Sequence, residues 1–334
     1  MKRMVAEEAA RATLNAVRAS GAREGEGKRA LITGLRGFTG SYLARELAAA
    51  GYRVFGTVLP GGAAATRPDS ASGAEDVFAT DIFPADLLDR AAVAGVVEQV
   101  RPDVAVHLAG IACVAHQDAE QIYRVNVAAT RNLLEALAAS PHAPSGVLLA
   151  SSANIYGNAQ AGLIDESVAP MPANDYAVSK LAMEYMASLW MDRLPIVIAR
   201  PFNYTGVGQS DSFLLPKIVS HFRRGASCIE LGNLAIARDF SDVRMVAASY
   251  RRLLAAAPAG QAFNVCSGRS YSLASVIRMM EEIAGYRIEV RVNPALVRAN
   301  EVLTLAGDNT KLAGAIGALD PIPLADTLRW MYGM

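Results

Sequence analysis

The chain has 334 residues, a length that predicts about two domains at roughly 150 residues each, or one large domain. Hydrophobic residues make up 52% of it and charged residues 19%, so the chain can bury a sizeable core and is not expected to be disordered. The 32 Lys and Arg residues balance the 32 Asp and Glu residues, which argues against a protein that binds nucleic acid through a basic surface.

Cysteine usage and hydropathy predict the compartment. Cys113, Cys228 and Cys266 are far apart and form no C-x-x-C pair, which favours reduced thiols over a disulfide framework. No run of 18 apolar residues predicts a membrane span, and the N-terminus lacks the apolar centre of a signal peptide. We therefore expect a cytoplasmic protein without a membrane partner. Cys113 and His116 are spaced C-x-x-H, but a structural zinc needs four ligands, so no metal is predicted.

Short apolar segments alternate with longer amphipathic ones beyond residue 28. Strands are expected at 30–33, 53–58, 76–80, 103–108, 146–151 and 194–200. Helices are expected at about 38–50, 86–99, 118–139 and 175–190, with a loop rich in Gly, Ala and Ser at about 60–74. This alternation predicts an α/β fold, a Rossmann-like doubly wound parallel sheet with helices on both faces.

The pattern divides the chain into three parts. Residues 1–28 are rich in Ala, Arg and Glu and end in a polar run, which indicates a loose helical extension and a linker. Residues 29–200 form the predicted dinucleotide-binding domain. The alternation weakens after residue 200, so residues 201–334 are expected to form a smaller α/β lobe interwoven with the first.

A glycine-rich turn follows the first predicted strand. Gly34, Gly37 and Gly40 are spaced G-x-x-G-x-x-G, one residue longer at its start than the usual dinucleotide motif. Gly34 would permit the tight turn, Gly37 the approach of a pyrophosphate, and Gly40 the packing of helix on strand. Phe38 and Thr39 begin the helix, whose free N–H groups would bind the anion.

The end of the second strand bears on the choice of cofactor. A carboxylate there would bind the ribose 2′-hydroxyl of NAD(H), but the strand ends in Thr57, Val58 and Leu59. Arg36, inside the glycine turn, could instead face a 2′-phosphate. The sequence therefore favours NADP(H) and leaves NAD(H) possible.

Three polar side chains suggest carbonyl chemistry. Ser152 follows the strand expected at 146–151, while Tyr176 and Lys180 are four residues apart on one helix face. An ammonium beside a phenol favours the phenolate, so we expect a lowered pKa for Tyr176. Such a tyrosine can exchange a proton with an alcohol or ketone while a nicotinamide carries the hydride.

From Arg29 to the C-terminus these motifs resemble the extended short-chain dehydrogenase/reductase family. The resemblance implies that Ser152, Tyr176 and Lys180 are the catalytic triad, and that Tyr176 and Lys180 also contact the cofactor. It further implies adenine contacts, a loop beside the cofactor phosphates and ribose, and a helix-positioning asparagine. These residues are, in that order, Asp86 and Leu87; Leu108, Ala109 and Gly110; and Asn126.

The C-terminal half resembles the branch of this family that acts on GDP-sugars. The similar segments are 200–213, 231–233, 238–243, 263–268, 298–302 and 307–308. The resemblance implies that Asn203 contacts the sugar diphosphate, that arginines hold the diphosphate, and that a glutamate accepts from ribose hydroxyls. The implied substrate residues are Asn203, Phe213, Lys217, Arg238, Arg298 and Glu301, of which Lys217 is equally well explained as a surface ion pair.

One position separates the reactions of this branch. Its dehydratases carry an acid/base carboxylate two residues after the catalytic Ser or Thr, where this chain has Asn154 after Ala153. Neither side chain exchanges protons near neutral pH, so elimination would lose about 10²–10⁴-fold in rate. Its reductases often carry an acidic residue there too, which leaves a related keto-sugar open.

The resemblance therefore implies NADPH-dependent reduction of the C4 ketone of GDP-4-keto-6-deoxy-D-mannose to GDP-6-deoxy-mannose (GDP-D-rhamnose) or its C4 epimer. Tyr176 would donate the proton, Ser152 would hydrogen-bond the oxygen, and Lys180 would lower the Tyr176 pKa and bind the nicotinamide ribose. The alternatives are a nucleotide-sugar 4-epimerase, a 4,6-dehydratase and a non-catalytic NADP-binding protein. Family resemblance also implies a homodimer that pairs the helices at 118–139 and 175–190.

Overall fold

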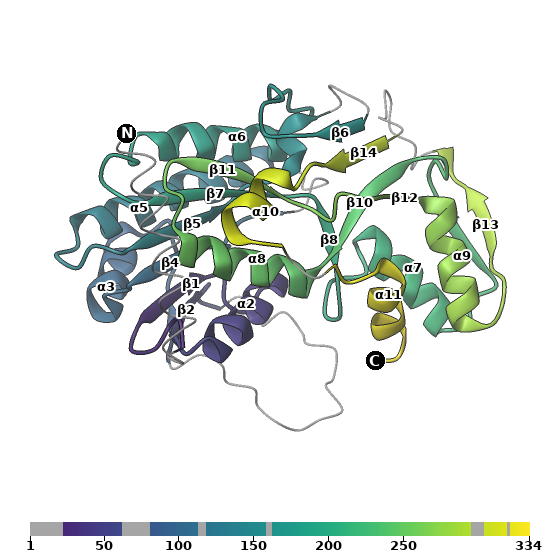
Figure 1. Ribbon diagram of the computed structural model, residues 1–334, viewed down its shortest axis with the longest axis horizontal. Helices are drawn as coiled ribbons and strands as arrows, with labels where there is room; N and C mark the ends of the chain where they lie inside the picture. Colours follow the sequence, from purple (N-terminus) through teal and green to yellow (C-terminus); the bar gives the residue numbers. More distant parts are fainter. Residues whose placement is uncertain (1–22, 62–80, 113–117, 158–161, 295–303, 319–320) are drawn as a thin grey trace.

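A computed structural model of the chain describes residues 23–61, 81–112, 118–157, 162–294, 304–318 and 321–334 (Figure 1). Its largest element is a parallel seven-stranded sheet. In spatial order the strands are β11 (Gln261–Val265), β7 (Ile196–Pro201), β5 (Gly146–Ala150), β4 (Val104–His107), β1 (Arg29–Thr33), β2 (Arg53–Val58) and β3 (Asp81–Pro84). The central strands are buried on both faces, as the apolar runs predict.

Helices cover both faces of this sheet (Figure 1). One face packs against α2 (Phe38–Ala49), α8 (Val243–Ala256) and α10 (Thr310–Ile316). The other packs against α3 (Arg90–Val100), α5 (Ala129–Ala139) and α6 (Asp175–Ser188). The two apolar clusters between the sheet and its helices form the core of the predicted Rossmann-like fold, which is confirmed.

A smaller lobe lies beyond the end of the large sheet (Figure 1). A five-stranded sheet contains β12 (Ser270–Ser272), β10 (Ala237–Asp242), β14 (Thr304–Gly307), β6 (Gly162–Ile164) and β8 (Asn203–Thr205). A third sheet pairs β13 (Glu289–Val292) with β9 (Cys228–Leu231). An apolar cluster joins these strands to α7 (Leu214–Arg223), α9 (Leu273–Ala284) and α11 (Leu324–Tyr332).

Each half of the chain lends a strand to the other sheet. β6 comes from the first half and pairs with β14 of the smaller lobe. β11 comes from the second half and pairs with β7 at the edge of the large sheet. The boundary at residue 200 stays a prediction, but these exchanges make the two halves interwoven.

Several predicted bounds shift for local reasons. The helix expected at 86–99 begins at Arg90 because Asp89 caps it, accepting from the N–H groups of Ala91 and Ala92 at 2.9 and 3.2 Å. The strand expected at 76–80 falls outside the described residues, and β3 begins directly after that range, at Asp81. The run 24–28 is more than a linker, since Glu24 pairs with Arg251 of α8.

The long helix expected at 118–139 is interrupted. It consists of α4 (Ala119–Tyr123), a π-turn (Arg124–Ala128) and α5. The wider turn holds Asn126, whose amide donates to the Ile111 carbonyl and to the Ser179 hydroxyl of α6, at 3.1 and 2.9 Å. This is a common use of a π-turn, which re-aims one side chain within a helix.

Candidate active site

Six predicted positions lie in or beside the glycine turn between β1 and α2. Gly34 has a left-handed backbone with φ of 73°, and a Cβ there would lie 2.9 Å from the Ala109 nitrogen. A Cβ at Gly40 would lie 2.4 Å from the Gly34 oxygen, so this glycine packs against the turn itself. Gly37 is exposed and Arg36 is also exposed. The turn thus leaves its middle open to a ligand.

The first turn of α2 has no side-chain cap. Free N–H groups at a helix start attract anions, and an uncapped start next to exposed backbone fits a cofactor diphosphate. The Thr39 hydroxyl is 2.7 Å from that of Tyr204, whose ring stacks on Phe38 with centroids 6.0 Å apart. Tyr204 of β8, which the sequence analysis missed, therefore links the turn to the smaller lobe.

The predicted adenine contacts lie between β3 and α3. Asp86 is exposed and its carboxylate accepts from the Leu88 nitrogen at 2.9 Å, which shapes the loop. Leu87 is buried, and its carbonyl accepts from the Asn132 amide at 2.9 Å. Both follow a strand of the large sheet at its carboxyl edge, where parallel sheets bind cofactors.

The loop after β4 brings cofactor and catalytic residues together. Leu108 and Ala109 follow the strand directly, and the Leu108 nitrogen donates to the Thr33 oxygen of β1 at 3.2 Å. A Cβ on Gly110 would lie 2.8 Å from Asn126 Oδ1 and 3.5 Å from Lys180 Nζ. Only glycine fits this gap without displacing the asparagine.

Ser152, Tyr176 and Lys180 converge at the end of β5. Ser152 caps a short helix (Ala153–Tyr156), and its hydroxyl oxygen accepts from the backbone and side-chain nitrogens of Asn154, both at 3.1 Å. The Ser152 side chain also hydrogen-bonds Tyr176. The ammonium of Lys180 donates to the Ala150 carbonyl at 2.8 Å. Three residues distant in sequence thus share one buried edge.

The protonation of these groups differs in one respect from the expectation. Burial raises the pKa of Tyr176 to about 12, although the Ser152 hydrogen bond lowers it. The lowered pKa expected from Lys180 is therefore wrong, because burial dominates. Burial also lowers the pKa of Lys180 to about 8, opposed by the charge of Glu184. At neutral pH the phenol keeps its proton, the form that can protonate an alkoxide.

A buried chain of hydrogen bonds supports the triad. Thr130 donates to the Asn126 carbonyl at 2.8 Å, so its oxygen can only accept from His107 Nε2, at 2.8 Å. His107 Nδ1 must then accept from the Thr33 hydroxyl, at 2.7 Å. The imidazole is thus neutral with its proton on Nε2, and burial lowers its pKa to about 3.

This network of hydrogen bonds continues into α6, the helix that carries Tyr176 and Lys180. Asn126 donates to the Ser179 hydroxyl, which donates to the Tyr176 carbonyl at 2.7 Å. His107 was not among the site residues predicted from the sequence. Its position at the end of β4, opposite Thr33 in the ladder, was the available signal.

The predicted substrate residues are more dispersed. Asn203 is exposed on β8, which pairs with β10, the strand that carries the half-buried Arg238. Phe213 is 41% exposed just before α7. Lys217 on α7 donates to the Glu230 carbonyl at 3.0 Å, a backbone contact rather than a surface ion pair. Two further predicted contacts, Arg298 and Glu301, lie outside the described residues.

No group of three or more His, Cys, Asp or Glu side chains in the described ranges is placed to hold a metal ion. Cys113 and His116 lie outside them. None of the described helices is both long and apolar enough to cross a bilayer.

The fold and the Ser–Tyr–Lys cluster define an extended short-chain dehydrogenase/reductase, a class of NAD(P)-dependent enzymes that modify nucleotide sugars. Residues 31–324 match the model of the family described as GDP-mannose 4,6 dehydratase, and the chain belongs to this family. The GDP-6-deoxy-D-talose 4-dehydrogenase of Aggregatibacter actinomycetemcomitans is 35% identical over 70% of this chain and 79% of its own. The GDP-6-deoxy-D-mannose reductase of Pseudomonas aeruginosa is 33% identical over 90% of this chain and 95% of its own.

Solved structures are similar over nearly the whole chain. A protein of Burkholderia cenocepacia J2315, proposed to be an epimerase, is 57% identical with a TM-score of 0.85, covering 92% of this chain and 98% of its own. The structure of RMD from Pseudomonas aeruginosa with NADPH is 31% identical with a TM-score of 0.76, at the same coverage. A relative with bound NADPH agrees with a nicotinamide cofactor for this class.

Proposed function

We propose that this chain uses NADPH to reduce the C4 ketone of GDP-4-keto-6-deoxy-D-mannose, giving GDP-6-deoxy-D-mannose (GDP-D-rhamnose) or its C4 epimer. The observation that carries the proposal is the buried Ser152–Tyr176–Lys180 cluster beside the neutral Asn154. A reductase and a dehydrogenase that act on GDP-6-deoxyhexoses are 33% and 35% identical to the chain, which supports this substrate class.

The chain's own groups would act as follows. The protonated phenol of Tyr176 donates its proton to the oxygen at C4, and the Ser152 hydroxyl donates a hydrogen bond to the same oxygen. Lys180 holds the cofactor ribose, and the open glycine turn holds the diphosphate. The nicotinamide supplies the hydride when bound. Burial of Tyr176 excludes water from the proton it transfers.

Elimination is disfavoured although the matching family model is described as a dehydratase. Asn154 occupies the place of the acid/base carboxylate, and its amide donates to Ser152 at 3.1 Å. An amide does not exchange protons near neutral pH, so it cannot expel the C6 hydroxyl. We expect the chain to leave GDP-mannose unchanged with either oxidised cofactor.

A 4-epimerase is the second candidate, favoured by the similarity to the Burkholderia cenocepacia protein. Both reactions would use the same triad. They differ in the cofactor, because an epimerase recovers it in each turnover while a reductase consumes it.

The deciding experiment mixes the purified protein with GDP-4-keto-6-deoxy-D-mannose and follows the absorbance of NADPH, with NADH in parallel. We expect stoichiometric oxidation of NADPH that is faster than that of NADH, and NMR of the product then assigns C4. No oxidation of either cofactor, with NADPH bound, overturns the reductase. Interconversion of GDP-sugars without net cofactor consumption would instead support the epimerase.

A further inference from the structure

Three side chains on one face of α6 meet three consecutive residues at the end of β5. Tyr176, Lys180 and Glu184 are spaced four apart, so they lie along one helix face. Tyr176 bonds Ser152, and Lys180 bonds the Ala150 carbonyl. Glu184 takes the remaining position, where its Oε1 accepts from the Ser151 hydroxyl at 2.5 Å. The proposed mechanism uses the first two side chains and gives the third no role.

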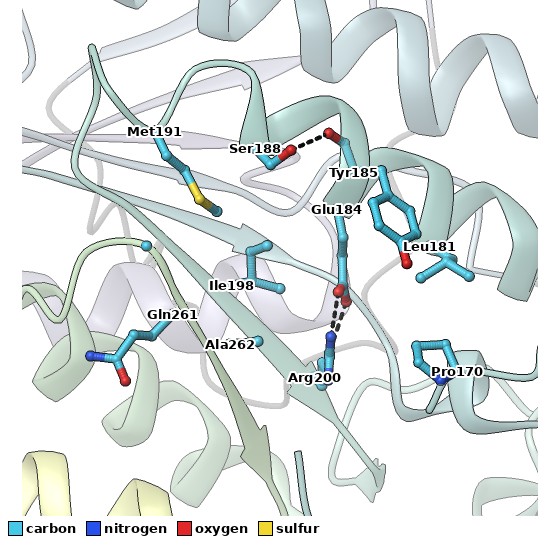
Figure 2. A pocket seen from close by; sticks show the side chains of 11 residues that line it. Pro170, Leu181, Glu184, Tyr185, Ser188, Met191, Ile198, Arg200, Gln261 and Ala262 are labelled. Carbon is cyan, nitrogen blue, oxygen red and sulfur yellow. Dashed lines mark hydrogen bonds and ion pairs between the residues drawn. The ribbon is translucent and has the colours of Figure 1, made fainter. Parts of the chain in front are cut away.

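The carboxylate of Glu184 is held firmly. Arg200 of β7 donates to both Glu184 oxygens, at 3.0 and 2.6 Å (Figure 2). The Glu184 side chain is 8% exposed and that of Arg200 is 11% exposed. Arg200 also donates to the Tyr156 hydroxyl at 2.9 Å, and Tyr156 donates to Asn264 Oδ1 at 2.8 Å. A bidentate pair fixes the orientation of a carboxylate as well as its place.

We propose that Glu184 is a positioning residue of the triad, which fixes the end of β5 through Ser151 and places a negative charge one helical turn from the Lys180 ammonium. This inference rests on the proposed function, in which a charged Lys180 holds the cofactor ribose. A buried ammonium loses its hydration, and a carboxylate nearby compensates for part of that loss. Glu184 raises the pKa of Lys180 against the larger effect of burial.

The other ionisable groups around Lys180 and Glu184 do not change their protonation across the neutral and alkaline range. His107 of β4 faces Lys180 and stays neutral, with a pKa of about 3, and Tyr176 stays protonated to about 12. Around Glu184, Arg200 stays charged. Burial raises the pKa of Tyr156, and the charge of Glu166 also raises it. Between pH 7 and 10, Lys180 is the group of this set that titrates.

Loss of the Glu184 charge should change the pH dependence of NADPH binding. Lys180 holds the cofactor in its charged form, which is lost as the pH rises through its pKa. Without the charge of Glu184, less opposes the effect of burial on Lys180. The pKa of Lys180 then falls further, and the Lys180 charge is lost at a lower pH. NADPH affinity should therefore weaken at a lower pH in Glu184→Gln than in the original protein.

The test is the dissociation constant of NADPH between pH 7 and 10, measured by fluorescence. The 2′-phosphate has its second pKa at about 6, so it stays dianionic throughout. We expect the pH at which binding weakens to fall on the order of one unit in Glu184→Gln. It should fall less in Glu184→Asp, whose shorter side chain keeps the charge but not its place, and stay unchanged in Ser151→Ala, which leaves the carboxylate on Arg200. Glu289→Gln, which removes an exposed ion-paired carboxylate from β13, is the matched control and should not differ.

An unmoved pH dependence in a folded Glu184→Gln protein overturns the proposal. Should that variant fail to fold, Glu184→Asp decides in the same way, and an unmoved pH dependence in that variant overturns the proposal. Failure of the proposed reductase is seen separately, as NADPH binding without oxidation when the keto-sugar is added.

Discussion

The hydroxyl of Tyr176 is the only part of that side chain that the proposed reaction needs. Tyr176→Phe removes the proton donor and keeps a buried ring of almost the same shape, 7% exposed. We expect kcat to fall about 10²–10⁴-fold, as when a general acid is lost, with NADPH affinity nearly unchanged. Steady-state kinetics and a fluorescence titration check this, and a variant with full kcat would exclude Tyr176 as the acid.

His107 gives the protein a pH-dependent stability of known sign. Its pKa falls from 6.5 to about 3 on folding, so the unfolded chain binds a proton that the folded one does not below pH 6.5. Stability is fully present above pH 6.5 and falls with pH, by about 2 kcal/mol at pH 5. Urea unfolding at pH 8 and 5 measures this loss. His107→Gln should reduce it, and an equal loss in both proteins would contradict the assignment.

Single residues were predictable where chemistry sets their spacing. The glycine turn and the Ser–Tyr–Lys set could be proposed as site residues because backbone geometry and helix periodicity restrict them. His107 and Glu184 were not, because their roles depend on partners from other strands, Thr33 and Arg200. The expected pKa of Tyr176 had the wrong direction because sequence spacing places a neighbouring charge but does not measure burial.

At the scale of the element, the start of α6 controls the site it carries. Asn174 caps the helix, and its side-chain oxygen accepts from the Ala177 nitrogen at 2.9 Å. Asn174→Ala should cost about 1 kcal/mol of stability and also lower kcat, because Tyr176 lies in the first turn. Ser272→Ala removes the equivalent cap of α9 and is the matched control. It should cost a similar stability, seen in urea unfolding, and leave kcat unchanged.

Elements with a clear apolar run or a long amphipathic pattern were predicted better than very short elements. The buried strands β1, β4, β5 and β7 follow apolar runs. The π-helical turn within the helix expected at 118–139 was missed because the apolar pattern is helical both before and after it. β6, β8 and β12 have three residues each, too few to show an alternation, and they form through pairing in the smaller lobe.

At the scale of the whole molecule, the outer face of α6 supports the family-based homodimer. Val178, Tyr185 and Leu189 at this face are 38%, 69% and 78% exposed. Large apolar side chains at helical spacing on one surface are typical of an interface. We propose that two copies pair through this face, and we expect a dimer in sedimentation velocity at micromolar concentration. The double variant Tyr185→Arg, Leu189→Arg should be monomeric, whereas a monomeric original protein would contradict the pairing.

The exchange of β6 and β11 between the two halves limits how this enzyme can be rebuilt. Substrate specificity is often altered by grafting one relative's binding lobe onto another's cofactor domain. A single cut after residue 200 would remove β11 from the edge of the large sheet and leave β6 without its partner β14. A chimera would have to keep α8, β11 and α10 with the cofactor domain and move residues 162–164 with the graft. Exchanging only the residues after 200 would therefore alter the large sheet as well as the smaller lobe.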